Sequence, residues 1–143
     1  MTPPGAKEKT SERQPGEAQP TTGLRPSPAC GSQASPWIVR FAHLALAGEK
    51  VLDVACGQGR HSLFFLERGH RVTAVDIGIS GMAALSGRPD LELAQADLEG
   101  DGRPWPFSGR QFGAVVVVNY LWRPLFPLLI AAVAPGGVLL YDT

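Results

Sequence analysis

Short apolar segments of this chain repeatedly end in residues whose types suit ligand binding. Two glycines spaced two apart let the backbone turn sharply and let a ligand approach where no Cβ stands in the way. Carboxylates and a side-chain amide follow later segments, and their oxygens accept hydrogen bonds from hydroxyl and amino groups. These residues are Asp53, Gly57, Gly59, Asp76, Asp97 and Asn119. Together they predict a site for a polar ligand of nucleoside type.

The three acids of this set suit three different partners. Asp76 ends the second apolar segment, where a carboxylate can accept both hydroxyl groups of a ribose, as in nucleotide-binding α/β folds. Asp97 ends the third segment and can reach the amino group of an adenine. Asp53 lies inside an apolar segment, where a carboxylate is costly to bury without a partner, and a cationic amine is a natural one. Each acid alone is equally well explained as a solvated turn residue, but three in succession are not.

These residues depend on elements that alternate between strand and helix. The expected strands are residues 50–55, 71–75, 91–96, 112–118 and 138–141, and the expected helices are 37–46, 60–68, 81–86 and 124–134. Four consecutive valines at 115–118 suit a strand that is buried on both faces. Residues 98–111 form a loop and 135–137 a turn, because both are rich in Gly and Pro.

This alternation predicts a Rossmann-like α/β fold, a doubly wound parallel sheet with right-handed crossovers. Such sheets bind ligands beyond the carboxyl ends of their strands, where the strand order reverses. The polar residues named above all fall at or near that edge, so we expect them to lie close together.

The composition restricts the classes of partner. Thirteen Lys and Arg balance thirteen Asp and Glu, so there is no basic field for binding nucleic acid. Cys30 and Cys56 form neither a disulfide framework nor a zinc site, and no residue spacing suits a metal. The longest apolar stretch, residues 125–134, is interrupted by Pro127 and is too short to span a membrane. We expect a cytoplasmic protein with a small-molecule substrate, without nucleic-acid or membrane partners, whose oligomeric state stays open.

The first part of the chain differs from the rest. Residues 1–36 hold seven of the thirteen prolines, and their only large apolar residues are Met1 and Leu24. Such a segment cannot bury enough surface to offset the entropy of ordering it. We expect a disordered leader over residues 1–36 and one folded domain over residues 37–143.

The sequence of the expected domain resembles a known family. The runs VLDVACGQGRH, VTAVDI, AQADLEG and VVVVNYL, followed by APGGVLLYDT, are similar to successive motifs of class I S-adenosylmethionine-dependent methyltransferases. The turn CGQGR followed by RVTAVD is most similar to small-molecule methyltransferases of the tellurite-resistance-like type. The resemblance implies S-adenosylmethionine as cofactor and methyl transfer to an unidentified small-molecule acceptor.

The resemblance also implies roles for residues around the first two strands. Asp53, Gly57 and Gly59 would surround the methionine part of the cofactor. Asp76 would hold the ribose hydroxyl groups, and Ile77 would pack on the adenine.

Residues after the third and fourth strands complete this implied site. Asp97 would meet the adenine amino group, and Leu98 would lie beside the ring. Asn119 would face the sulfonium side of the cofactor. No single catalytic residue can be identified, and Asn119, Tyr120 and Asp142 are the candidates for contact with the acceptor.

Two alternatives stay open at this stage. A nicotinamide dinucleotide fingerprint needs a third glycine, where this chain has Ser62, and Asp53 would repel a pyrophosphate. Members of the resembled family usually have seven strands, whereas this chain ends after the fifth expected one. A truncated, catalytically inactive fragment that still binds the cofactor is therefore the second hypothesis.

Overall fold

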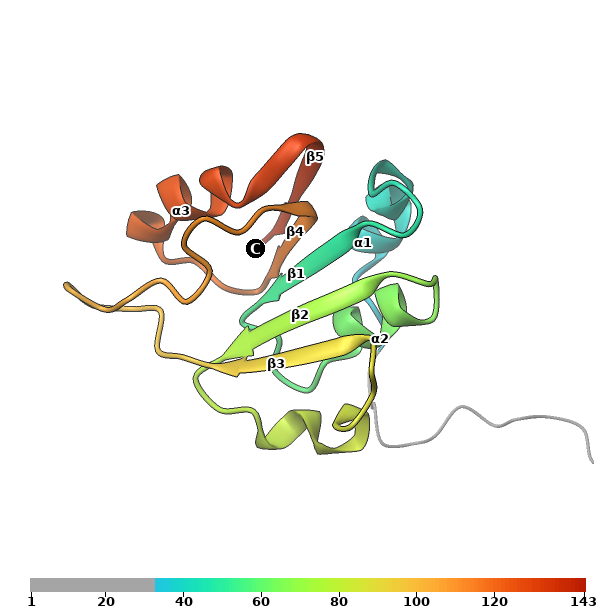
Figure 1. Cartoon of the computed structure of the whole chain (residues 1–143), viewed down its shortest axis with the longest axis horizontal. Coiled ribbons are helices and arrows are strands. Elements are labelled where there is room, and N and C mark those ends of the chain that lie inside the picture. Colours follow the sequence, from blue (N-terminus) through green and yellow to red (C-terminus); the bar gives the residue numbers. More distant parts are fainter. Residues whose placement is uncertain (1–32) are drawn as a thin grey trace, which may run out of the picture.

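A five-stranded parallel sheet forms the centre of the computed structural model, which describes residues 33–143. Its strands are β1 (Lys50–Val54), β2 (Arg71–Asp76), β3 (Leu91–Gln95), β4 (Phe112–Val118) and β5 (Val133–Asp142). They lie in the order β3-β2-β1-β4-β5 (Figure 1), and every neighbouring pair is parallel. The predicted doubly wound sheet is thus confirmed, with the reversal of strand order between β1 and β4.

Short helices cover both faces of the sheet. They are α1 (Pro36–Phe41), α2 (Arg60–Leu66) and α3 (Phe126–Ala131), with 3-10 turns at Ala42–Leu44, Ser80–Leu85 and Arg123–Leu125. The helices α1 and α2 lie on one face, and α3 lies on the other with the loop that precedes β4 (Figure 1). None of the helices within residues 33–143 is long and apolar enough to cross a membrane.

The core consists of two apolar clusters, one on each face of the sheet. All seven residues of β4 are buried, because alternate side chains point into opposite clusters. Val116 packs with Ile38 and Phe65 on the α1 and α2 face, whereas Val115 packs with Leu129 on the α3 face. This two-sided burial explains the valine run, since each buried valine contributes about 1.5–3 kcal/mol.

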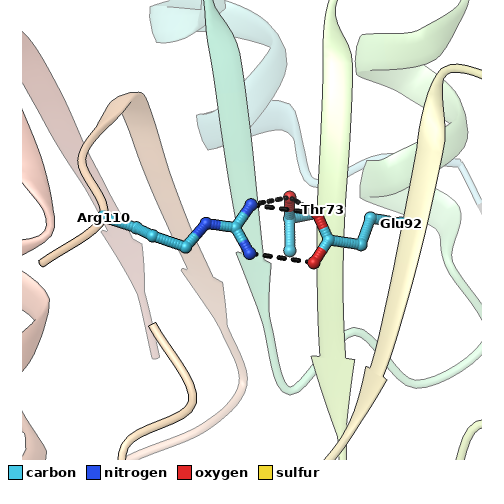
Figure 2. Close-up of polar contacts among 3 residues, drawn as sticks. All are labelled: Thr73, Glu92 and Arg110. Atoms are coloured by element: carbon cyan, nitrogen blue, oxygen red, sulfur yellow. Dashed lines mark hydrogen bonds and ion pairs between the residues drawn. The ribbon is translucent and has the colours of Figure 1, made fainter. Parts of the chain in front are cut away.

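One polar cluster joins the residue before β4 to side chains of β2 and β3, as Figure 2 shows. Arg110, just before β4, donates two hydrogen bonds to the carboxylate of Glu92 on β3, at 2.8 and 2.9 Å. The hydroxyl of Thr73 on β2 lies within 3.4 Å of both groups. The guanidinium therefore anchors the end of the long loop 98–111 to the two strands at the far side of the sheet.

The fifth strand differs from the prediction. We expected a turn over residues 135–137 and a strand from Val138, but β5 begins at Val133 and the turn residues lie within it as an irregularity opposite Phe112–Ala114. Gly137 makes this possible, because a Cβ there would stand 2.8 and 2.9 Å from two backbone carbonyl oxygens. The helix before it ends at Ala131, three residues earlier than expected.

The amino-terminal boundary of the domain also differs in detail. Most of the expected leader, residues 1–32, lies outside the described residues, so its disorder stays a prediction. Ser35, which we assigned to that leader, is buried and bonded to the rest of the domain. The described domain thus includes Ser35 and Pro36, the first residue of α1.

The turn after β1 packs tightly at Gly59. This residue has a φ of +81°, a conformation that suits glycine, and it is buried. A Cβ at this position would collide with the Met82 side chain in the 3-10 turn Ser80–Leu85. Gly59 is therefore required by packing as well as by backbone conformation.

Replacing Gly59 by Ala should destabilise the fold by about 2–4 kcal/mol, the sum of left-handed strain and overpacking. The matched control is Gly48→Ala, because Gly48 has a similar φ of +78° but no atom within 4 Å of its would-be Cβ. The control should lose only the stability that left-handed strain costs, about 1–2 kcal/mol. Denaturant unfolding measures both, and equal losses would contradict the packing role of Gly59.

Candidate functional site

Two adjoining cavities open at the carboxyl edge of the sheet, where the strand order reverses. The larger, of about 320 Å³, is lined by acids and is called the acidic cavity here. Its walls include Asp76, Ile77, Asp97, Leu98, Glu99 and Tyr120. The smaller, of about 260 Å³, lies against the Gly57-Gln-Gly59 turn and is called the turn cavity; Gly57, Arg60, His61 and Asn119 help to line it. Ala55 lines both cavities, so they adjoin at the end of β1.

Asp76 lines the acidic cavity, and its carboxylate is hydrogen-bonded to Gly57 in the lining of the turn cavity. Its Oδ2 accepts the N–H of Gly57 at 2.9 Å, and its Oδ1 accepts the N–H of Gly78 at 3.0 Å. Each carboxylate oxygen can accept more than one hydrogen bond, so both keep capacity for donors from a ligand. The backbone holds this carboxylate in one orientation between the loops that follow β1 and β2.

Asp97 lies at the far side of the acidic cavity. Its Oδ1 accepts the N–H of Glu99 at 3.0 Å, and its Oδ2 forms an ion pair with Arg103 at 3.1 Å. Ile77, which is 67% exposed, and Leu98 supply apolar surface to the same cavity. The cavity thus combines hydrogen-bond acceptors with apolar walls, as recognition of a nucleoside requires.

One residue of the acidic cavity was missed by the sequence analysis. Glu99 follows Asp97 closely in the chain, and its place in the same loop is the only signal that points to it. Tyr120, a candidate for contact with the acceptor, also lines this cavity, and its contact with an acceptor stays a prediction. Its hydroxyl is buried without a hydrogen-bond partner in the described part of the chain, and burial together with nearby Glu99 raises the pKa of Tyr120 to about 12.

Asp53 lines neither cavity. It is 2% exposed, and its Oδ2 accepts the hydroxyl of Ser62 at 2.6 Å. Burial raises the pKa of Asp53 to about 6, although the hydrogen bonds from Ser62 oppose the shift. The partner that we expected to be a ligand amine is thus supplied by α2, and a role of Asp53 at an amine stays a prediction.

The turn cavity has an unusual backbone. Gly57 has a φ of +55°, and a Cβ there would meet no atom within 4 Å, so its surface is open to a ligand. Ala55 and Asn119, which directly follow β1 and β4, also have a φ of +55°. At Ala55 this conformation costs about 1–2 kcal/mol, whereas asparagine adopts it more readily. Such strain is concentrated at functional sites. Nothing in the sequence signals the strain at Ala55.

His61 and Cys56 line the turn cavity without offering reactive groups. His61 is buried, and its Nε2 accepts the backbone N–H of Ser35 at 3.1 Å. Burial lowers the pKa of His61 to about 4. Burial raises the pKa of Cys56 to about 12, so its thiol is not a reactive thiolate. Within residues 33–143 no cluster of three metal-ligating side chains occurs.

The geometry therefore groups most of the predicted residues. Asp76, Ile77, Asp97 and Leu98 meet in the acidic cavity, and Gly57 and Asn119 lie in the turn cavity. Neither Gly59 nor Asp53 lines a cavity. Gly59 packs against Met82 instead. The positions are observed, whereas the contacts of each residue with a cofactor stay predictions.

Comparison with known proteins agrees with this geometry. The family described as a methyltransferase domain matches residues 51–137, more than half of the chain. The chain belongs to the class I S-adenosylmethionine-dependent methyltransferases. The matched residues contain β1 to β4 and the cleft described above.

Curated relatives of this methyltransferase chain carry several methyltransferase names. The ubiquinone biosynthesis O-methyltransferase of Stutzerimonas stutzeri is 30% identical over 71% of this chain and 47% of its own length. The demethylmenaquinone methyltransferase of Renibacterium salmoninarum is 33% identical over 66% of this chain and 41% of its own length. The chain thus spans about half the length of the curated relatives that it matches.

Solved structures give the same result for the fold. A glycopeptide N-methyltransferase complexed with S-adenosylmethionine is 28% identical, with a TM-score of 0.56, over 72% of this methyltransferase chain and 51% of that chain. A TehB-like methyltransferase from Corynebacterium glutamicum is similar in fold, with a TM-score of 0.59 and 21% identity over 78% of this chain and 63% of that chain.

Replacing Asp53 by Asn should remove a titration that lowers stability at higher pH. Because burial raises the pKa of Asp53 from 3.8 to about 6, the folded state binds this proton more tightly than the unfolded state does. The stability of wild type minus that of Asp53→Asn should therefore fall as pH rises from about 4 to about 6, by up to about 3 kcal/mol. Denaturant unfolding across this range measures the difference.

His61 titrates over the same range in the opposite sense. Its lowered pKa of about 4 means that the folded state binds this proton less tightly, so its contribution makes stability rise with pH. Both proteins contain His61, and the subtraction removes its effect. A difference that does not change with pH would show that Asp53 titrates alike in the folded and unfolded states.

Proposed function

We propose that this methyltransferase chain binds S-adenosylmethionine across both cavities and transfers its methyl group to a small-molecule acceptor. The nucleoside occupies the acidic cavity, and the methionine part occupies the turn cavity. One observation carries the proposal: the Asp76 carboxylate lines the acidic cavity and is fixed by the N–H of Gly78 and by that of Gly57, which lines the turn cavity.

The chemistry of the residues fits this cofactor. Asp76 accepts hydrogen bonds from ribose hydroxyl groups, and Asp97 accepts one from the adenine amino group beside the apolar walls of Ile77 and Leu98. A nicotinamide dinucleotide fits less well, because Ser62 stands where its fingerprint needs a third glycine. The backbone at Gly57 leaves room for close approach of the methionine part.

The site contributes orientation more than proton transfer. When bound, S-adenosylmethionine supplies an activated methyl group on a positively charged sulfur, which a nucleophile can accept directly. Cys56 stays a thiol because its pKa is raised to about 12, and the Nε2 of His61 is already occupied by the Ser35 N–H. Holding the acceptor in line with the methyl group can lower the barrier by several kcal/mol, up to about 7–11 in ideal cases.

A small-molecule acceptor is supported by the names of the relatives. They include ubiquinone biosynthesis O-methyltransferases and a glycopeptide N-methyltransferase, which differ in the atom methylated. The balanced charge of the chain also fits an acceptor other than nucleic acid. Asn119, which has a left-handed backbone and lines the turn cavity, is the residue that we place nearest to the acceptor.

Calorimetric titration of the full chain tests the cofactor. We expect micromolar binding of S-adenosylmethionine and S-adenosylhomocysteine and no binding of NADH, because the turn after β1 lacks the third glycine of a dinucleotide fingerprint. Mass-spectrometric detection of S-adenosylhomocysteine with a panel of phenols and amines then tests transfer. Binding without transfer would limit the function to cofactor binding, and tight NADH binding would overturn the proposal.

Replacing Asp76 by Ala should weaken S-adenosylhomocysteine binding by about 1.5–3 kcal/mol, the usual value for hydrogen bonds to a charged group. The matched control is Asp90→Ala, which removes an acid at the opposite end of the sheet, where it pairs with Arg88. Titration of both variants, with thermal unfolding to show that each is folded, gives the comparison. Equal affinities in a folded Asp76→Ala variant would remove Asp76 from the cofactor site.

A further inference from the structure

A further cavity, of about 220 Å³, lies at the amino-terminal edge of the sheet and is called the edge cavity here. Its walls are the first residues of β1, β2 and β3 together with Arg110 at the end of the loop 98–111. Because the strands are parallel, the acidic cavity and the turn cavity lie at their other ends. The proposed function therefore gives the edge cavity no role.

Four polar side chains of the edge cavity lie on one face of the sheet. Lys50 of β1 is paired in register with Arg71 of β2. Thr73, two residues further along β2, is paired with Glu92 of β3. Paired residues of a parallel sheet share a face, as do residues two apart in one strand. Arg110, just before β4, extends to Thr73 and Glu92 (Figure 2), so cations from three segments meet at one cavity.

Both acids that line the edge cavity are already bound by arginines. Glu92 accepts two hydrogen bonds from Arg110, at 2.8 and 2.9 Å. Asp90 accepts two from Arg88, both at 3.0 Å, and Arg88 itself does not line the cavity. Such paired bonds between a guanidinium and a carboxylate are among the strong ones in proteins, so these acids are committed to their own partners.

Lys50 and Arg71 are left without an acid of their own. Among residues 33–143 neither forms an ion pair, and both side chains are exposed. The hydrogen bonds from Arg110 lower the pKa of Glu92, and the charge of Lys50 adds a smaller effect in the same direction. Two neighbouring cations repel each other, and an anion held between them would replace this repulsion by attraction.

A buried hydroxyl completes the lining of the edge cavity. Thr73 is 4% exposed, and its hydroxyl lies 3.4 Å both from Oε2 of Glu92 and from Nη2 of Arg110. Hydrogen bonds in proteins are normally shorter, at about 2.5–3.2 Å, so both contacts are weak. The Thr73 hydroxyl can therefore turn to donate to an oxygen atom in the cavity.

We propose that the edge cavity binds a small phosphate group, as free phosphate or a short phosphomonoester, between Lys50 and Arg71. Its volume is below the roughly 300–1,000 Å³ of cavities for drug-sized ligands, so the ligand is smaller than a nucleotide. An ammonium and a guanidinium both suit phosphate oxygens, and a dianion matches two cations that lack acidic partners. This site is separate from the proposed cofactor site and does not depend on it.

Calorimetric titration of the full chain with inorganic phosphate and with glycerol 3-phosphate, at constant ionic strength, tests the site. We expect one molecule per chain with a dissociation constant below about 1 mM. Equal affinities identify free phosphate as the ligand, and tighter binding of the ester identifies a phosphomonoester. Saturating phosphate should leave the affinity for S-adenosylhomocysteine within twofold, because the two sites lie at opposite edges of the sheet.

Arg71→Gln and Lys50→Gln should each weaken phosphate binding by about tenfold or more, because each removes charged hydrogen bonds. The matched control is Arg68→Gln, which removes the same charge from another exposed arginine outside the cavity and should bind like wild type. Equal weakening in the control would show attraction to the general charge of the surface and overturn the site. Absence of phosphate binding to folded wild type, or displacement of S-adenosylhomocysteine by phosphate, would also overturn it. Phosphate binding without S-adenosylhomocysteine binding would support this site and contradict the proposed function.

Discussion

The carboxylate of Asp76 is the interaction on which the rest of the site depends. It lies at the end of β2 and accepts the N–H of Gly57 from the loop after β1, so two loops far apart in sequence are held together. Because β1 and β2 are parallel and in register, with Val54 opposite Val75, these loops must leave the sheet side by side. The carboxylate lines the acidic cavity and holds Gly57 of the turn cavity beside it.

The sheet provides this arrangement through burial. The seven residues of β4 fill both apolar clusters, and this places Asn119 beside the end of β1. Left-handed backbone occurs where burial ends, at Ala55 and Asn119 beside the carboxyl ends of the two central strands. The packed sheet supplies the stability that keeps Ala55 in this costly conformation.

Opposite chemistry at the two ends of the cleft gives it a direction. Carboxylates gather after β2 and β3, while the side chain of Arg60 stands at the start of α2. The buried side chains of Asp53 and His61 have local hydrogen-bond partners, in the hydroxyl of Ser62 and the N–H of Ser35. These bonds occupy both groups and leave the recognition of a ligand to other side chains that line the two cavities.

Residue types and their spacing determined the architecture and most of the site. The alternation of apolar runs with glycine turns predicted the parallel sheet, because strand burial and helix periodicity are local properties of the chain. The acids at strand ends predicted one edge for the cleft, since parallel strands end together. Only the tertiary structure decided what each side chain meets. Gly59 proved to be a packing residue because Met82, far along the chain, fills the space beside it. Asp53 accepts a hydrogen bond from Ser62, Tyr120 lines the acidic cavity, and the expected turn at residues 135–137 lies within β5. All three depend on contacts between separate segments, which no local pattern encodes.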